Sequence, residues 1–200
     1  HVGNALATAA VALECGMALV DVAAALGRAV PASRWRMEVT ERPDGVVVIN
    51  DAYNANPESM RAALEALVSV AGPRGARGAR SFAVLGPMAE LGAHGPDEHE
   101  ALGRLAVRMD VSRVIAVGEQ ARPIHHGAAL EGSRDGGSSW VADAAAAIAV
   151  LRGELRPGDV VLVKASRTAS LERVALAIAH DSGTGSEPGT ATDGTGGTGA

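Results

Sequence analysis

The sequence predicts an α/β fold in which a mostly parallel sheet carries helices on both of its faces. From residue 46 to residue 180, short apolar runs alternate with segments of helical spacing. Short apolar strands separated by helices favour a parallel sheet that is covered on both sides. Polar motifs also follow three of the apolar runs, at the end of the strand where such sheets bind their ligands.

The first part of the chain is predicted to be helical. Residues 4–29 are rich in alanine with helical spacing, and Gly16 interrupts the pattern, so we expect two short helices that end before Pro31. Residues 34–50 then alternate, turn at residues 43–45 and become apolar again. This pattern predicts a β-hairpin.

The remaining elements are expected in strict order along the chain. They are a helix from Pro57 to residue 71, strand 81–86, helix 97–109, strand 113–118, strand 138–143, helix 144–155, a turn and strand over 157–167, and helix 168–180. Residues 119–137 show no clear pattern. From residue 181 to residue 200 the chain is rich in Gly, Thr and Ser, and we expect disorder there. The prediction is a Rossmann-like domain over 32–180, preceded by a helical segment over 1–31.

Composition and charge exclude several classes of protein. The net charge of -5 and the pI of about 5.7 argue against a nucleic-acid surface. No apolar run reaches membrane-spanning length and no signal peptide is visible, so we expect a cytoplasmic protein without membrane insertion. The single cysteine, Cys15, lies in an apolar helical run and is expected to be buried, which suits a reducing compartment. Because the chain opens without Met inside a helical pattern, we also expect that an N-terminal part is missing.

Three motifs follow predicted strands: "NDAYNANPESM" (50–60), "GPMAELG" (86–92) and "VKASR" (163–167). Asp51 can accept hydrogen bonds from a ribose diol. Asn54 and Asn56 each offer an acceptor oxygen and a two-proton amide donor, enough to grip a peptide-like ligand. The alternative is that these residues cap the helix that begins near Pro57.

The last motif contributes Lys164, Ser166 and Arg167, which suit a carboxylate or phosphate beside a helix N-terminus. The alternative is a solvated strand end, but Lys164 is the only lysine among 18 basic residues, which favours a functional role. In "GPMAELG", Gly86 can permit close backbone approach and Glu90 can face the cleft, but a plain turn is the favoured interpretation of this motif taken alone.

Two further patterns argue against a metal site and against a phosphate-binding loop in this chain. His94 and His99 stand five residues apart, so they do not share a helical face and a metal site is not expected. No G-x-x-x-x-G-K-[ST] motif occurs anywhere in the chain.

Together with "NALATAA" (4–10), "RM" (36–37) and His99, these motifs resemble the Mur ligase family over residues 1 to about 180. The resemblance implies that 1–31 is the C-terminal end of the central ATPase domain and that 32–180 is the C-terminal domain. The family's phosphate loop, magnesium-binding residues and modified lysine would lie upstream. The intact protein is therefore expected to be an ATP- and Mg²⁺-dependent ligase, and this segment alone to be inactive.

The resemblance also implies a reaction in peptidoglycan precursor synthesis. ATP phosphorylates the terminal carboxylate of UDP-N-acetylmuramoyl-tripeptide, and the amine of D-Ala-D-Ala attacks the acyl phosphate. The implied ATP-binding residues are Asn4, Arg36 and Asp51. The residues implied near the dipeptide are Tyr53, Asn54, Asn56, Lys164, Ser166 and Arg167. A monomer is expected.

Two other functions stay open at this point. One is a sibling ligase that adds a different amino acid, or a folylpolyglutamate-type relative. The other is a free-standing α/β module that binds a nucleotide or peptide without chemistry. Ala165 also departs from the family, since glycine is common at this position and tolerates backbone geometries that alanine does not.

Overall fold

The computed structural model describes residues 2–29, 34–72, 79–133 and 137–181, and it divides into two compact units, His1–Arg36 and Met37–Ala200. In the first unit, α1 (Val2–Glu14) and α2 (Leu19–Gly27) confirm the two predicted helices. Gly16 has a φ of +87° in the turn between them, a conformation that favours glycine. Pro31 and residues 182–200 of the predicted disordered tail lie outside the described residues, whereas Asp181, the first residue of that tail, is described and forms an ion pair with Arg152.

The helices of the first unit expose most of their apolar side chains. Leu6 is 66% exposed and Val20 is 73% exposed, and Val22 is the one buried apolar residue among those described in this unit. The prediction that Cys15 is buried is therefore wrong, because the thiol is exposed. The sequence shows an apolar helical run correctly, but burial depends on what packs against it. No described helix is long and apolar enough to cross a bilayer.

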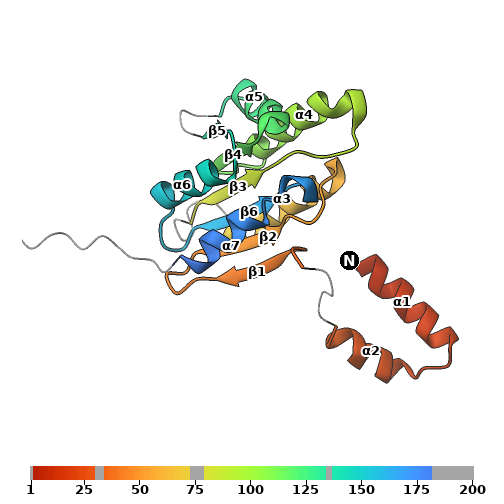
Figure 1. The fold of residues 1–200 in the computed structure, drawn as a ribbon. Helices are drawn as coiled ribbons and strands as arrows, with labels where there is room; N and C mark the ends of the chain where they lie inside the picture. Colours follow the sequence, from red (N-terminus) through yellow and green to blue (C-terminus); the bar gives the residue numbers. More distant parts are fainter. Residues whose placement is uncertain (1, 30–33, 73–78, 134–136, 182–200) are drawn as a thin grey trace, which may run out of the picture. The chain divides into compact units, whose positions relative to one another are not determined.

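The second unit is built on a six-stranded sheet (Figure 1) with the order β1-β2-β6-β3-β4-β5. The strands are β1 (Glu38–Glu41), β2 (Val47–Asp51), β3 (Ser81–Leu85), β4 (Arg113–Val117), β5 (Ser138–Val141) and β6 (Val160–Lys164). β1 pairs antiparallel with β2, as the predicted hairpin requires, and all other neighbouring strands are parallel. The mostly parallel α/β sheet is thus confirmed.

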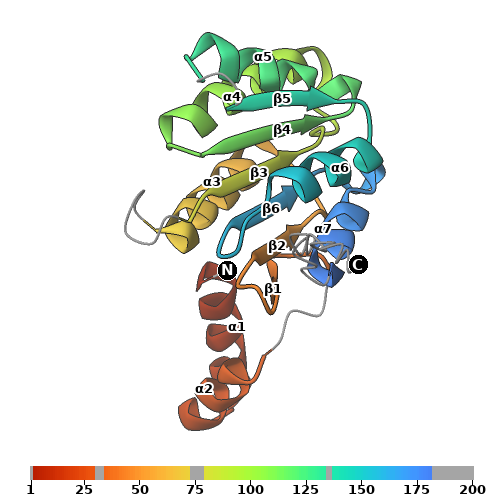
Figure 2. The same cartoon turned by 90° about the vertical axis from the view of Figure 1, so that its left-hand side faces the viewer.

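Five helices cover this sheet within the described residues (Figure 2). They are α3 (Pro57–Ala71), α4 (Gly95–Arg108), α5 (Arg122–Leu130), α6 (Ala144–Glu154) and α7 (Glu172–His180). Side chains on successive residues of a strand point to opposite faces. Ala83 and Leu85 accordingly pack with α3, α4 and α5, whereas Phe82 and Val84 pack with α6 and α7. The prediction of helices on both faces is confirmed.

Helix α5 was not predicted, because Pro123 and Gly127 break the helical pattern of residues 119–137. The structure explains both residues. Pro123 lies in the first turn, where its missing N–H has no helical partner to lose. A Cβ on Gly127 would lie 2.0 Å from the carbonyl oxygen of Glu100, and one on Gly103 would lie 1.9 Å from that of Ile124. Packing against α4 therefore stabilises α5 despite its poor intrinsic propensity.

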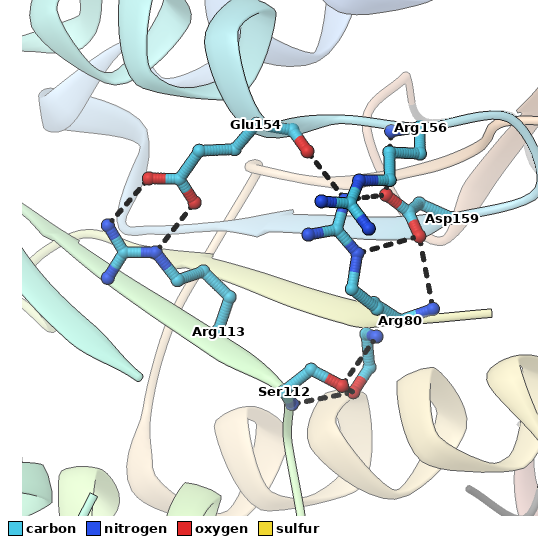
Figure 3. A network of polar contacts seen from close by, with 7 residues as sticks. Arg80, Ser112, Arg113, Glu154, Arg156 and Asp159 are labelled. Carbon is cyan, nitrogen blue, oxygen red and sulfur yellow. Dashed lines mark hydrogen bonds and ion pairs between the residues drawn. The ribbon is translucent and has the colours of Figure 1, made fainter. Parts of the chain in front are cut away.

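A network of ion pairs and hydrogen bonds links the elements at the amino edge of the sheet (Figure 3). Asp159, which is 2% exposed, precedes β6 and accepts from Arg80 Nη2 at 2.6 Å and from the Arg156 backbone N at 2.8 Å. Arg80 Nη2 also donates to the Glu154 carbonyl oxygen at 2.5 Å. These bonds tie the start of β3 to the start of β6 and to the end of α6.

Two further pairs complete the same edge. Arg113, at the start of β4, forms a two-point ion pair with the Glu154 carboxylate, with Nε–Oε2 and Nη2–Oε1 distances of 2.8 and 3.0 Å. Ser81 and Ser112 bond each other across β3 and β4, with Ser81 N donating to Ser112 Oγ at 3.1 Å and Ser112 N donating to Ser81 Oγ at 2.9 Å. Arg113 Nη1 is buried without a hydrogen-bond partner, whereas the other polar groups named here bond one another.

Candidate functional site at the carboxyl edge of the sheet

The site begins with an ion pair between the last residues of two neighbouring strands. Asp51 ends β2 and Lys164 ends β6, and the two are partners in the register of the sheet. Lys164 Nζ donates to Asp51 Oδ2 at 2.5 Å and to the Asn54 carbonyl oxygen at 2.8 Å. The exposed fraction of the side chain is 3% for Lys164 and 14% for Asp51. The ammonium group of the chain's only lysine is thus buried and paired with acceptors of the protein itself.

The other oxygen of the same carboxylate is also engaged. Asp51 Oδ1 accepts from the backbone N of Met37 at 3.0 Å, so the carboxylate joins β2 to the residue that precedes β1. A carboxylate has about four lone-pair sites, and two are used here. Asp51 therefore keeps the capacity to accept from a ligand hydroxyl while its orientation is held from two sides.

Asn54 and Asn56 have different roles in the structure. The Asn54 side chain is exposed, and the backbone carbonyl oxygen of Asn54 accepts from Lys164. Asn56 caps α3: Oδ1 accepts from Ser59 N at 2.8 Å, and Asn56 N donates to Ser59 Oγ at 3.0 Å, which completes a capping box. The capping alternative therefore describes Asn56.

Ser166 connects the loop after β3 to the loop after β2. Its backbone N donates to the Pro87 carbonyl oxygen at 2.9 Å, and its Oγ accepts from Ala89 N at 2.8 Å. The same hydroxyl lies 3.5 Å from the Ala55 carbonyl oxygen. Ser166 is 3% exposed, so these bonds fix the position of "GPMAELG" relative to the loop that contains Ala55.

His99 holds the same loop from the side of α4. Its Nε2 accepts from Met88 N at 2.9 Å, and its Nδ1 lies 2.6 Å from the Gly95 carbonyl oxygen. An Nε2 that accepts carries no proton, so these bonds assign the proton to Nδ1. Sequence reasoning tested His99 only as a metal ligand and missed this role. Within the described residues, no cluster of three His, Cys, Asp or Glu side chains could hold a metal ion.

The missing side chain of Gly86 leaves room for neighbouring side chains of the protein and not for a ligand. A Cβ at Gly86 would lie 2.6 Å from the Ala165 Cβ and 2.7 Å from Leu171 Cδ1. Ala165 is fully buried and is not among the described residues with positive φ, so alanine fits its backbone without strain. The two positions share one small volume, which explains why alanine at 165 demands glycine at 86.

Tyr53, Glu90 and Arg167 are three further side chains of these loops that are exposed or partly exposed. The Arg167 guanidinium lies 5.3 Å from the centroid of the Tyr53 ring, within cation–π range, and thereby bridges the loops after β6 and β2. Glu90 is exposed and has a φ of +65°, a conformation that costs a non-glycine residue energy. The carboxyl edge thus presents a carboxylate, a guanidinium group and an aromatic ring to solvent.

A cleft of about 340 Å³ lies further along the same edge, beyond β4 and β5. The loop after β4 leads to α5 on one face of the sheet, and the loop after β5 leads to α6 on the other face, which is the geometry of a topological switch point. The lining is Pro87, Val117, Gly118, Glu119, Gln120, Ala142, Asp143, Ala144, Ala169, Leu171 and Arg173. Of the three sequence motifs, only "GPMAELG" contributes to it, through Pro87.

The other two predicted ATP-binding residues belong to the first unit. Asn4 is exposed on α1, where its carbonyl oxygen accepts from Thr8 Oγ1 at 2.9 Å. Arg36 is exposed in the bend that follows Trp35. The structure therefore brings together Asp51, Asn54 and Lys164 directly, joins Tyr53 to Arg167, and places Asn4 and Arg36 on the first unit.

Comparison with known proteins gives one family. The model of the Mur ligase glutamate ligase domain matches residues 35–167. The UDP-N-acetylmuramoyl-tripeptide–D-alanyl-D-alanine ligase of Mycobacterium bovis is 55% identical over 93% of this chain, which covers 39% of that protein. The Escherichia coli enzyme of the same name is 32% identical over 89% of this chain, which covers 36% of it. The chain thus spans less than two fifths of the length of these relatives.

Solved structures agree with the sequence relatives. MurF from Acinetobacter baumannii superposes with a TM-score of 0.77 at 27% identity, over 89% of this chain and 37% of that one. MurF ligase from Thermotoga maritima, solved in complex with ADP, superposes with a TM-score of 0.59 at 28% identity, over 81% of this chain and 36% of that one.

Proposed function

Because the chain belongs to the Mur ligase family, we propose that it is the C-terminal part of an ATP-dependent ligase that joins D-Ala-D-Ala to UDP-N-acetylmuramoyl-tripeptide. The 55% identity to the mycobacterial enzyme of that name carries this proposal. The position of Asp51 and the neighbouring loops at the carboxyl edge of a parallel sheet supports it independently, since this is where such sheets bind ligands.

We also propose the domain division that the sequence predicted. Residues 1–31 would be the end of the central ATPase domain, and 32–180 the C-terminal domain. The exposed apolar side chains of α1 and α2, such as Leu19 at 68%, fit a segment that packs against the remainder of a larger domain.

Three residues are proposed to hold the nucleotide. Asp51 would accept hydrogen bonds from the ribose hydroxyls, because its carboxylate is fixed by two protein contacts and still has acceptor capacity. Asn4 would lie near the adenine, and Arg36 near the ribose or the phosphates. ATP supplies the phosphoryl group that activates the tripeptide carboxylate.

The dipeptide is proposed to meet the loops after β2 and β6. Arg167, held over Tyr53, provides positive charge for the dipeptide carboxylate, and Asn54 provides an exposed amide. Ser166 would act by fixing both loops rather than by contact, because its hydroxyl is already bonded. Asn56 is assigned to capping α3.

Magnesium and the triphosphate are proposed to be held by the part of the protein outside this chain. The 200-residue sequence contains no G-x-x-x-x-G-K-[ST] motif, and its described residues offer no three-ligand cluster. We therefore expect no ATPase or ligase activity from this chain alone. We also propose that the full-length enzyme, with ATP and a UDP-linked precursor as substrates, is a monomer of the cytoplasm.

The full-length protein tests the proposal directly. Incubated with ATP, magnesium, UDP-N-acetylmuramoyl-tripeptide and D-Ala-D-Ala, it should release phosphate and form the pentapeptide product. A sibling ligase would instead consume ATP with a single amino acid such as L-glutamate. A binding module would retain nucleotide or peptide without releasing phosphate from any acceptor.

A further inference from the structure

We propose that Lys164 is a positioning residue for Asp51, and that it does not touch the dipeptide. It holds the Asp51 carboxylate and the backbone of Asn54 in the arrangement that the ribose of the nucleotide requires. This inference rests on the proposed function, and it replaces the role that sequence reasoning gave to Lys164.

The geometry of the ammonium group carries the argument. Nζ lies 2.5 Å from Asp51 Oδ2 and 2.8 Å from the Asn54 carbonyl oxygen, so two of its three donors are used inside the protein. The side chain is only 3% exposed. A dipeptide carboxylate would have to displace one of these partners or enter a closed space.

Burial makes that displacement costly. An ammonium taken out of water is stabilised only by its partners, and removing one partner of such a pair leaves an uncompensated charge. Asp51 Oδ1 is held at the same time by Met37 N at 3.0 Å. The carboxylate is therefore fixed at both oxygens, and Lys164 decides the direction in which its remaining lone pairs point.

The choice of lysine in a chain that otherwise uses arginine supports the same role. Lys164 is the one lysine among 18 basic residues. A compact ammonium with tetrahedral donors reaches a carboxylate and a backbone carbonyl at once in a narrow space, whereas a planar guanidinium presents a fixed fork. Arg167, exposed and within cation–π range of Tyr53, is a cation of these loops that suits a dipeptide carboxylate.

Steady-state kinetics of the full-length ligase distinguish the two roles. Lys164→Met should raise the KM for ATP by about tenfold or more, as Asp51→Asn should, and leave the KM for D-Ala-D-Ala within about twofold. In the double variant, Lys164→Met should add nothing to the ATP KM of Asp51→Asn, because it acts through that carboxylate. KM does not depend on the folded fraction, so partial unfolding cannot imitate this result.

Arg156→Met is the matched control, since it removes an exposed cation near the other end of β6 and should leave both KM values unchanged. The inference is wrong if Lys164→Met raises only the dipeptide KM, or if its effect on ATP multiplies with that of Asp51→Asn. If the wild-type protein ligates no dipeptide, the proposed function fails instead. Calorimetric ATP affinities of the same variants then still decide the role of Lys164.

Discussion

The two edges of the parallel sheet both carry networks of paired charge, but one network fixes strand and helix ends and the other fixes loops. At the amino edge, Asp159 and Glu154 tie strand starts to a helix end by bonds to Arg80 and Arg113. At the carboxyl edge, Asp51, Lys164 and Ser166 hold loops. An ion pair at a strand end therefore does not by itself mark a binding site. What distinguishes the carboxyl edge is that its pairs position loops with exposed functional side chains.

The largest expected effect is at the amino edge. Asp159→Ala removes the acceptor for the Arg80 side chain and for two backbone N–H groups, of Arg80 and Arg156. Leaving these donors without their buried acceptor should lower the free energy of unfolding by about 3 kcal/mol, measured by urea denaturation of this chain. An accompanying rise in the KM for ATP of the full-length enzyme would contradict the assignment of the amino edge to stability alone.

At the carboxyl edge, Gly86→Ala should lower the free energy of unfolding by about 2 kcal/mol. The new Cβ would collide with Ala165 and Leu171, and overpacking of this kind costs about 1–3 kcal/mol. Adding Ala165→Gly removes one of the two contacts and should recover part of the loss. Purely additive effects in urea denaturation would show that the two positions do not share the volume.

Replacing His99 with Leu should cost about 1–2 kcal/mol, because Met88 N–H loses its buried acceptor. The loss should be local. Hydrogen exchange of the Met88 amide should accelerate, whereas that of Val160, whose N donates to the Arg80 carbonyl oxygen at the amino edge, should not change. Equal acceleration at both amides would mean that the two edges unfold together.

The smallest expected effect concerns pH. Burial lowers the pKa of His125, and the charges of Arg113, His126 and Arg122 lower it further. The unfolded chain therefore takes up a proton more readily than the folded one, so stability is full above about pH 6.5 and falls as the pH drops through the lowered folded pKa. His125→Gln should flatten this fall between pH 7.5 and pH 5, as measured by thermal unfolding. An unchanged slope would show that His125 does not cause the fall of stability at low pH.

Local patterns were enough to predict most of the fold. The hairpin, the buried strands and the helix that begins at Pro57 are marked by turn residues and apolar runs within a few positions. Helix α5 was missed because its stability comes from the close contact of Gly103 and Gly127 with the opposing backbones, which no local pattern reports. The exposure of Cys15 was missed for the same reason, since burial depends on distant neighbours.

The site could be predicted in its location but not in its contacts. Parallel strand ends share an edge, so three motifs after three strands were expected to meet. The bond between Lys164 and Asp51 spans 113 positions and depends on β6 lying beside β2, an order that periodicity does not determine. Sequence reasoning therefore assigned the two residues to different substrates, whereas the structure joins them.

We propose that the carboxyl-edge network serves nucleotide binding and that the amino-edge network serves stability. The most direct test is calorimetric measurement of ATP affinity in the full-length Asp51→Asn and Asp159→Asn variants at a temperature where both are folded. Loss of one charge-assisted bond, about 1.5–3 kcal/mol, should weaken ATP binding about tenfold or more in Asp51→Asn. Asp159→Asn should bind ATP as the wild type does, with a lower Tm. Unchanged affinity in Asp51→Asn, or an equal loss in Asp159→Asn, would contradict the claim.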